Sequence, residues 1–153
     1  MPKPARIQFT KQGYQKVEKD FKDLTQKRKE AVIRLRTARE MGDLSENGAY
    51  KAARFELSSI DRELRRLSYL LRLGEVVETQ NTGVVDFGRR VMIDDGTKHI
   101  TFILVNVYES DPRQEKLSIN SPIGRAILGK RVGDTVTVTA PAGKTTYTVV
   151  DIN

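Results

Sequence analysis

The feature that most constrains the fold is an apolar seam in the first half of the chain, with steps that alternate between three and four residues. Its members are Tyr14, Val17, Phe21, Leu24, Arg28, Ala31, Leu35 and Ala38, and only Arg28 interrupts its apolar character. A second seam with the same spacing comprises Tyr50, Ala53, Leu57, Ile60, Leu64, Leu67 and Leu71. This spacing over several heptads is typical of coiled-coil packing. Because only a few residues separate the two stretches, they predict an antiparallel hairpin of two long helices.

The ends of these helices carry capping signals. Thr10 is a candidate N-cap, with Phe9 before it and Tyr14 four residues into the helix, the arrangement of a hydrophobic staple. Gly42 suits the left-handed conformation that closes many helices, and Gly74 marks the end of the second helix. We therefore expect a hairpin over residues 1–74. A rod of two helices is too thin to enclose a substrate pocket, so its turn is the part expected to act.

After the hairpin the apolar period changes to two. Residues 75–82 are expected to form a linker, and residues 83–153 a second domain. Four stretches rich in β-branched residues predict strands, and Pro122–Leu128 predicts a short helix with Ser121 as its N-cap. The predicted strands are Val84–Ile93, Ile100–Val107, Thr135–Thr139 and Thr145–Ile152. The expected fold class is α+β, with a small and mostly antiparallel sheet.

The composition excludes several classes of function. The chain has no cysteine, and its single histidine, His99, is too little for a zinc site or a Ser-His catalytic system. No stretch suits a secretory signal or a membrane helix, so we expect a cytoplasmic protein without membrane contact. The net charge is +7. Residues 1–74 contain 18 Lys/Arg and 10 Asp/Glu, so the positive excess lies there and suggests a polyanionic partner.

Two carboxylates, Asp43 and Glu46, lie three residues apart where the second helix is expected to start. One interpretation is a capping box, in which Asp43 bonds backbone amides and Glu46 reaches back. The other is a pair of metal ligands, because carboxylate oxygens are the donors that Mg²⁺ prefers. The spacing alone favours the capping box.

Two sequence strings resemble the Gre family of bacterial transcript-cleavage factors. The turn reads A-R-E-M-G-D-L-S-E-N from Ala38 to Asn47, followed by Tyr50, and is similar to the family's A-R-x-x-G-D-L-x-E-N-x-x-Y pattern. The stretch S-I-N-S-P-I-G-R-A-I-L-G from Ser118 to Gly129 is similar to the family's S-x-x-S-P-x-G-x-A-L-L-G segment. The two strings lie some 70 residues apart in the family's order, and the resemblance spans nearly the whole chain.

The resemblance implies a fold, a partner and a mode of action. The fold is a coiled-coil hairpin followed by an FKBP-like domain, expected in a monomer that docks at the rim of the secondary channel of RNA polymerase. The hairpin then reaches the polymerase active site and stimulates hydrolysis of a backtracked RNA 3′ end. The implied catalytic and metal-binding residues are Asp43 and Glu46, which would hold Mg²⁺ jointly with the polymerase, while the isolated chain binds none stably. The implied docking residues are Ser121, Pro122, Ile123 and Leu128.

Several alternatives remain beside this interpretation. Arg34, Arg39, Lys51 and Arg54 are candidate contacts to RNA phosphates, although a solvated helix surface explains the same charges. Arg28 could instead set the register of the seam, and Ser45 and Asn47 could position the turn, whereas Tyr50 is expected to pack in the seam.

Two other functions compete with transcript cleavage: a non-cleaving relative that occludes the channel, and a prolyl isomerase. The C-terminal half has few aromatic residues for an isomerase pocket. Whether cleavage would follow the A-type or the B-type pattern is not set by these residues.

Overall fold

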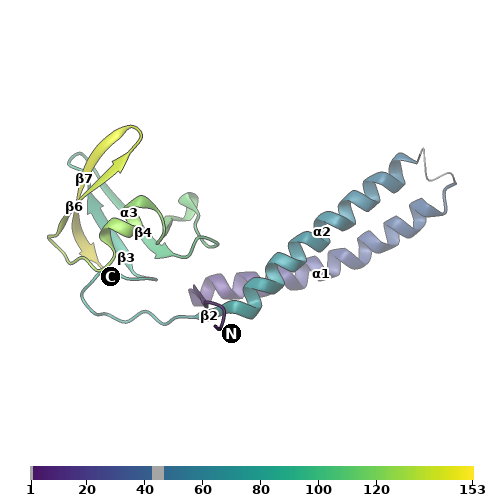
Figure 1. Ribbon diagram of the computed structural model, residues 1–153, viewed down its shortest axis with the longest axis horizontal. Helices are drawn as coiled ribbons and strands as arrows, with labels where there is room; N and C mark the ends of the chain where they lie inside the picture. The colour runs from purple at the N-terminus through teal and green to yellow at the C-terminus, as the bar shows by residue number, and fades with distance from the viewer. Residues whose placement is uncertain (1, 43–46) are drawn as a thin grey trace. The chain divides into compact units, whose positions relative to one another are not determined.

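A computed structural model describes residues 2–42 and 47–153 (Figure 1). The chain divides into two compact units. The first contains Tyr14–Gly74 with the residues before Ile7, and the second contains Ile7–Gly13 and Glu75–Asn153. The first helix thus begins in one unit and continues in the other.

The first unit is built from two long helices, α1 (Lys11–Arg39) and α2 (Gly48–Leu73). Contacts between them pair Tyr14 with Leu71, Arg28 with Asp61, and Arg34 with Glu56. The partner's residue number falls as the first rises, so the helices are antiparallel. Every residue of the two predicted seams is buried or half-buried, which confirms the periodicity. Leu67 and Leu70 are almost fully buried, and such burial contributes about 1.5–3 kcal/mol for each side chain.

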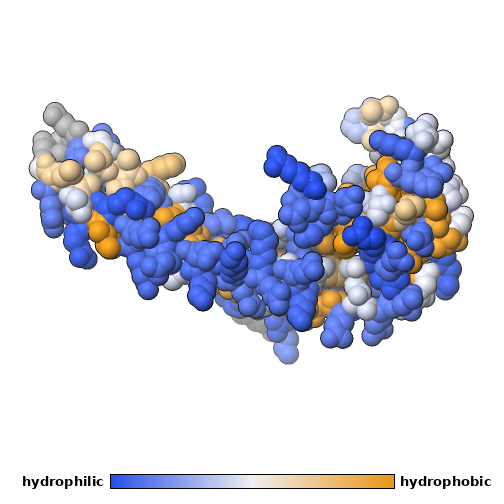
Figure 2. All heavy atoms as spheres, turned by 180° about the vertical axis from the view of Figure 1, so that it is seen from behind, coloured by the Kyte–Doolittle hydropathy of each residue, from blue (hydrophilic) through white to orange (hydrophobic). Residues whose placement is uncertain are grey.

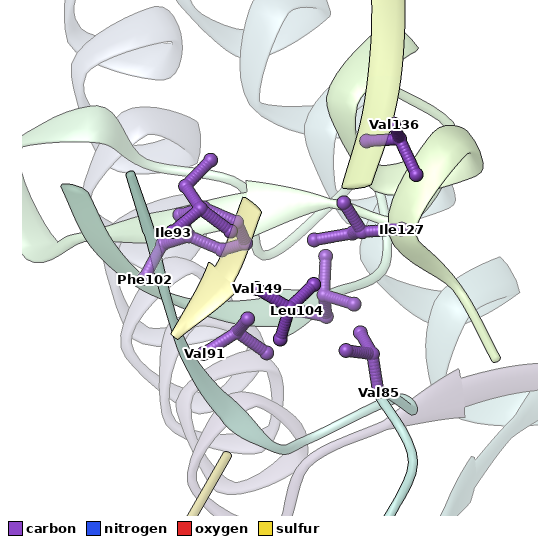
Figure 3. Packing of buried hydrophobic residues seen from close by; sticks show 8 residues of the cluster. All are labelled: Val85, Val91, Ile93, Phe102, Leu104, Ile127, Val136 and Val149. Carbon is purple, nitrogen blue, oxygen red and sulfur yellow. The ribbon is translucent and has the colours of Figure 1, made fainter. Parts of the chain in front are cut away.

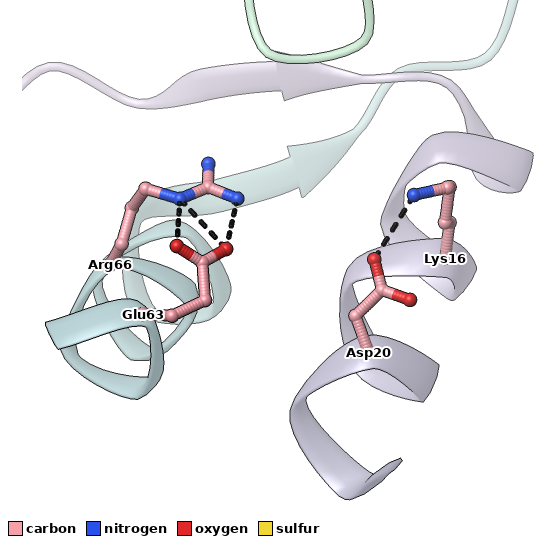
Figure 4. A network of polar contacts seen from close by, with 4 residues as sticks. All are labelled: Lys16, Asp20, Glu63 and Arg66. Carbon is pink, nitrogen blue, oxygen red and sulfur yellow. Dashed lines mark hydrogen bonds and ion pairs between the residues drawn. The ribbon is translucent and has the colours of Figure 1, made fainter. Parts of the chain in front are cut away.

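Ion pairs supplement the apolar seam. Arg28 donates from Nε to Asp61 at 2.5 Å, so the one charged member of the first seam is paired across the hairpin. This hydrogen bond lowers the pKa of Asp61. Lys16–Asp20 on α1 and Glu63–Arg66 on α2 are pairs within a single helix (Figure 4). Hydrophilic side chains cover most of the helix surface visible in Figure 2.

Helix α1 starts at the predicted cap. The Thr10 hydroxyl accepts a hydrogen bond from the amide of Gly13 at 3.0 Å, as expected of an N-cap. Glu109 accepts from both the amide and the hydroxyl of Thr10. Just before the cap, β1 (Ile7–Phe9) pairs with β2 (Gly74–Val76) in a two-stranded sheet. The predicted linker over residues 75–82 therefore begins with two strand residues, which the sequence pattern does not predict.

The second unit contains a five-stranded sheet with the order β5-β4-β3-β7-β6. Strands β3 (Arg90–Asp94), β4 (His99–Val105), β6 (Thr135–Ala140) and β7 (Gly143–Ile152) pair in antiparallel fashion. The short strand β5 (Lys116–Ser118) follows a 3₁₀ turn, Pro112–Gln114, and pairs parallel to β4. The sheet is thus mixed, and the α+β class is confirmed.

One predicted strand boundary is wrong. The first strand of this sheet starts at Arg90, not at Val84. The intervening segment turns, because Gly88 has φ +77° and the Asp86 carboxylate accepts a hydrogen bond from the amide of Phe87. Val85 and Phe87 are nevertheless buried, which explains why this stretch has the apolar content of a strand.

The core of the second unit lies between the sheet and helix α3 (Pro122–Ile127), as Figure 3 shows. Strand β6 shows the predicted alternation, since Val136 and Val138 are buried and the threonines between and beside them are exposed. Eight buried residues form the cluster: Val85, Val91, Ile93, Phe102, Leu104, Ile127, Val136 and Val149.

Candidate functional site

The turn of the hairpin is bounded by the end of α1 and the start of α2. Gly42, after the end of α1, has φ +117°, a conformation that favours glycine. Asp43, Leu44, Ser45 and Glu46 lie outside the described residues, so the structure does not place the two predicted catalytic and metal-binding carboxylates. Among the described residues, no group of acidic or histidine side chains could hold a metal ion.

The N-cap of α2 is Asn47. Its backbone is extended, with φ −82° and ψ 99°, and its Oδ1 accepts a hydrogen bond from the amide of Tyr50 at 3.1 Å. The capping interpretation assigned this role to Asp43, and that assignment is wrong because the N-cap must directly precede Gly48, the first residue of the helix. The start of α2 is therefore capped without Asp43.

The side-chain amide of Asn47 also contacts the other helix, α1. Asn47 Nδ2 donates to the carbonyl oxygen of Ala38 at 2.7 Å, one residue before the end of α1. That carbonyl also accepts from the amide of Met41 at 3.2 Å. Helix ends leave carbonyls without partners inside the helix, and Asn47 satisfies one of them from across the turn.

Two guanidinium groups flank the ring of Tyr50. Arg39, the last residue of α1, lies 5.9 Å from the ring centroid, and Arg54 of α2 lies 5.8 Å from it. Cations at this distance are attracted to the face of an aromatic ring. Tyr50 is thus half-buried in the seam, as predicted, and also holds two positive charges beside the turn.

The other two candidate RNA contacts differ from each other. Arg34 donates two hydrogen bonds to the Glu56 carboxylate, at 3.1 and 2.5 Å, so its charge is balanced. This pair lowers the pKa of Glu56 and raises that of Arg34, mainly through the hydrogen bonds. Lys51 is exposed on the first turn of α2. The cluster beside the turn is therefore Arg39, Lys51 and Arg54 rather than all four predicted residues.

The residues predicted to dock on a partner have mixed environments. Ser121 caps α3, because its hydroxyl accepts from the amide of Gly124 at 3.0 Å. Ile123 packs against the core. Pro122 and Leu128 are exposed and are the members available to a partner.

Comparisons with known proteins decide the family. Two family models match the chain. The one described as "Transcription elongation factor, N-terminal" matches residues 7–76, and the one described as "Transcription elongation factor, GreA/GreB, C-term" matches residues 79–153. The chain belongs to the GreA/GreB family. The resemblance found in the sequence is thereby confirmed, and the protein is a member of a family of transcription elongation factors.

Curated GreA/GreB relatives match over nearly the full length. Transcription elongation factor GreA of Thermosipho africanus is 37% identical, with 98% of each chain covered. The same factor of Geobacillus kaustophilus is also 37% identical, with 99% of each chain covered. Among solved structures, GreA factor homolog 1 of Thermus thermophilus is 26% identical and matches 97% of this chain and 99% of its own, with a TM-score of 0.47. In the described part of the chain, no helix is both long enough and apolar enough to span a membrane.

Proposed function

We propose that this GreA/GreB family member binds RNA polymerase, inserts its hairpin turn into the secondary channel and stimulates the polymerase's cleavage of backtracked RNA. The observation that carries the proposal is the family match over nearly the full chain, combined with two carboxylates in the short connection between α1 and α2. The factor acts as a cofactor of the polymerase and rescues arrested complexes.

In this proposal Asp43 and Glu46 supply the factor's share of a Mg²⁺ site that the polymerase completes. Two carboxylates hold Mg²⁺ weakly on their own, because the ion keeps several waters and needs near-octahedral oxygen ligands. A Mg²⁺ held there would supply, together with a second metal of the polymerase, stabilisation of the attacking and leaving oxygens of an in-line displacement at phosphorus. The N-cap of α2 is Asn47, so capping of this helix does not require Asp43.

The positively charged residues near the turn suit RNA, the second partner in this proposal. Arg39 is the last residue of α1 and Arg54 lies in the second turn of α2, and no carboxylate pairs with either of them within 4.0 Å in the described residues. Positive side chains bind RNA through its phosphates, without regard to sequence. We assign these two residues and Lys51 to the extruded RNA 3′ segment.

The test is a transcript-cleavage assay on a stalled, backtracked elongation complex. Wild-type protein is expected to release 3′-terminal RNA fragments in the presence of Mg²⁺. Asp43→Asn and Glu46→Gln are expected to lower the cleavage rate by about a hundredfold or more while polymerase binding survives. Raised Mg²⁺ should restore part of the rate, because mass action offsets weaker binding. The double variant should be little worse than either single variant, as for groups that act as one unit.

Two outcomes would contradict the proposal. Wild-type rates in both neutral variants would remove the carboxylates from the mechanism. Polymerase binding without any fragment release by wild-type protein would favour the alternative, a non-cleaving factor that occludes the channel.

A further inference from the structure

The end of α2 and the N-terminal arm, residues 3–6, form an open hollow of about 580 Å³. It lies within the first unit, at the opposite end of α2 from the turn. Sites for small ligands have volumes of about 300–1,000 Å³, so the hollow is large enough for one. Its lining residues are Lys3, Pro4, Arg6, Tyr69, Arg72 and Leu73. Three of them are cationic and none is acidic, so the wall of the hollow is positive.

The charges around this hollow are not balanced by ion pairs. In residues 2–42 and 47–153, no carboxylate lies within 4.0 Å of the charged groups of Lys3, Arg6 or Arg72. Arg6 Nη1 donates to the carbonyl oxygen of Arg72 at 3.2 Å, which holds the arm against the last turn of α2. This bond uses one of the five N–H groups of the guanidinium. Like charges around one hollow repel one another, so the arrangement favours an anionic ligand.

Tyr69 adds an aromatic side chain to this positive wall. It lies between the seam residues Leu67 and Leu71 in the sequence, yet it is 45% exposed and does not pack in the seam. A single exposed tyrosine is ordinary. Here, however, the Arg72 guanidinium lies 5.9 Å from the ring centroid. Nucleobases stack both on aromatic rings and on guanidinium planes, so the two side chains together suit a flat aromatic ligand.

We propose that this hollow binds a nucleoside polyphosphate, with its base against Tyr69 and Arg72 and its phosphates on Lys3 and Arg6. Inorganic phosphate would use only the cations, and an uncharged base would use only the flat surface, whereas a nucleotide uses both. The cations converge on one hollow, which favours a compact ligand over an extended strand. Arg72 lies roughly 35 Å along α2 from the start of this helix, so the site is separate from the turn. The inference does not depend on the proposed function.

The experiment is isothermal titration calorimetry on the full chain, without polymerase and at fixed ionic strength. ATP is the probe, and adenosine, inorganic tripolyphosphate and a short oligouridylate test the base, the phosphates and an RNA strand separately. We expect ATP to bind at one site with a dissociation constant below about 1 mM. Adenosine and tripolyphosphate should each bind at least about tenfold more weakly, because each lacks one half of the contacts.

Substitutions test whether the binding takes place in this hollow. Arg72→Gln should raise the dissociation constant for ATP about tenfold, because a charge-assisted contact is lost. Tyr69→Leu should raise it about fivefold or more, and Tyr69→Phe should leave it near wild type, because phenylalanine keeps the ring. The matched control is Arg62→Gln, which removes the same charge from an exposed residue of α2 that does not line the hollow. It should bind ATP as wild type does.

Circular dichroism shows whether each variant is folded. Lys3→Gln, which lies outside every helix and strand of the described chain, replaces Arg72→Gln in the test if the latter unfolds. No binding of ATP at millimolar concentration overturns the proposal. Equal weakening by Arg62→Gln also overturns it, since binding would then follow the net charge. Equal affinity for tripolyphosphate and ATP would leave no role for the base, and oligouridylate that binds where ATP does not would assign the hollow to a strand. Either result would contradict a nucleotide site.

These outcomes are separate from those of the cleavage assay. Failure of ATP binding leaves fragment release by wild-type protein untouched, and failure of fragment release leaves ATP binding untouched.

Discussion

Single asparagine side chains join distant parts of the chain in both units. Asn47 links α1 to α2, and the buried Asn106 donates to the carbonyl of Gln8 and to Glu109. The Oδ1 of Asn106 accepts from the amides of Tyr108 and Glu109. In both cases the amide uses its donor and its acceptor on different segments. An acid of the same shape would lose the donor, so these positions demand an amide for its chemistry rather than for its size.

Tyr50 also serves two roles, and its ring gives a prediction. Tyr50→Leu keeps an apolar side chain in the seam but removes the aromatic face that Arg39 and Arg54 approach, whereas Tyr50→Phe keeps that face. Each cation–π contact at an exposed site contributes about 0.5–1 kcal/mol. We expect Tyr50→Leu to raise the factor concentration for half-maximal cleavage about three- to tenfold, and Tyr50→Phe to leave it near wild type. Equal effects of the two substitutions would show that the arginines do not depend on the ring.

At the level of elements, the sequence predicted the parts that depend on local patterns. The seams, the Thr10 and Ser121 caps and the alternation of β6 follow from periodicity and capping chemistry. The short strands β1, β2 and β5 could not be predicted in this way, because each has three residues and depends on a distant partner, as in the bond from the amide of Ile103 to the carbonyl of Glu115.

The candidate site was predictable to a similar extent. Asp43 and Glu46 came from the motif, and they remain predictions because they lie outside the described residues. The N-cap was misassigned because the motif offers Asp43, Ser45 and Asn47, all good caps, and only the observed start of α2 distinguishes them.

The start of α1 gives a prediction about close packing. A Cβ at Gly13 would lie 1.7 Å from Glu109 Oε1, and hydrogen bonds from Thr10 and Asn106 hold that carboxylate. Gly13→Ala should therefore displace Glu109 and lose bonds worth about 1.5–3 kcal/mol each, more than the roughly 1 kcal/mol that alanine gains in a helix. We expect Gly13→Ala to lower the melting temperature of the full chain.

The control for this prediction is a double-mutant cycle with Glu109→Ala. In that background the obstacle is gone, so Gly13→Ala should become neutral or stabilising. If Gly13→Ala lowers the melting temperature equally with and without the Glu109 carboxylate, the clash is not the cause.

The interhelical ion pairs predict a pH dependence of the hairpin. Hydrogen bonds from Arg28 and Arg34 lower the pKa of Asp61 and Glu56 below their ordinary values of 3.8 and 4.5. A carboxyl whose pKa is lower in the folded state stabilises the fold above its ordinary pKa, and this stabilisation is lost as the pH falls through the lowered value. At neutral pH, the melting temperature measured by circular dichroism should therefore be higher for wild-type protein than for the double variant Asp61→Asn/Glu56→Gln.

That difference should shrink below about pH 4 and disappear in stronger acid. It should also shrink in high salt, because both pairs are solvent-exposed. A difference in melting temperature that does not change with pH would mean that these pairs stabilise the hairpin through packing of their side chains rather than through charge.

At the scale of the whole molecule, the two units carry different chemistry. The net positive charge resides in residues 1–74, where Arg39 ends α1 and Lys51 and Arg54 lie in the first two turns of α2. The second unit is nearly neutral and presents exposed apolar side chains, among them Leu128 and Val132. Charged groups suit RNA and metal, and exposed apolar side chains suit a protein surface. Binding and cleavage should therefore be separable by mutation.

Leu128 provides the sharpest test of this separation. It is 44% exposed, whereas Ile123 packs against the core, so a change at Leu128 perturbs the fold less. We expect Leu128→Ser to raise the factor concentration for half-maximal cleavage about fivefold or more, because loss of an apolar anchor costs about 1 kcal/mol or more, without changing the rate at saturation.

The matched control is Val107→Ser, at a residue that is 55% exposed and lies outside the Ser121–Leu128 segment. This control should change neither quantity. Combined with Asp43→Asn, which is expected to lower the saturated rate, Leu128→Ser should act independently, so that the double variant shows both defects at the size of each single one. A drop in the saturated rate with Leu128→Ser alone, or an equal shift with Val107→Ser, would contradict a division in which the second unit binds and the turn of the hairpin acts on the RNA.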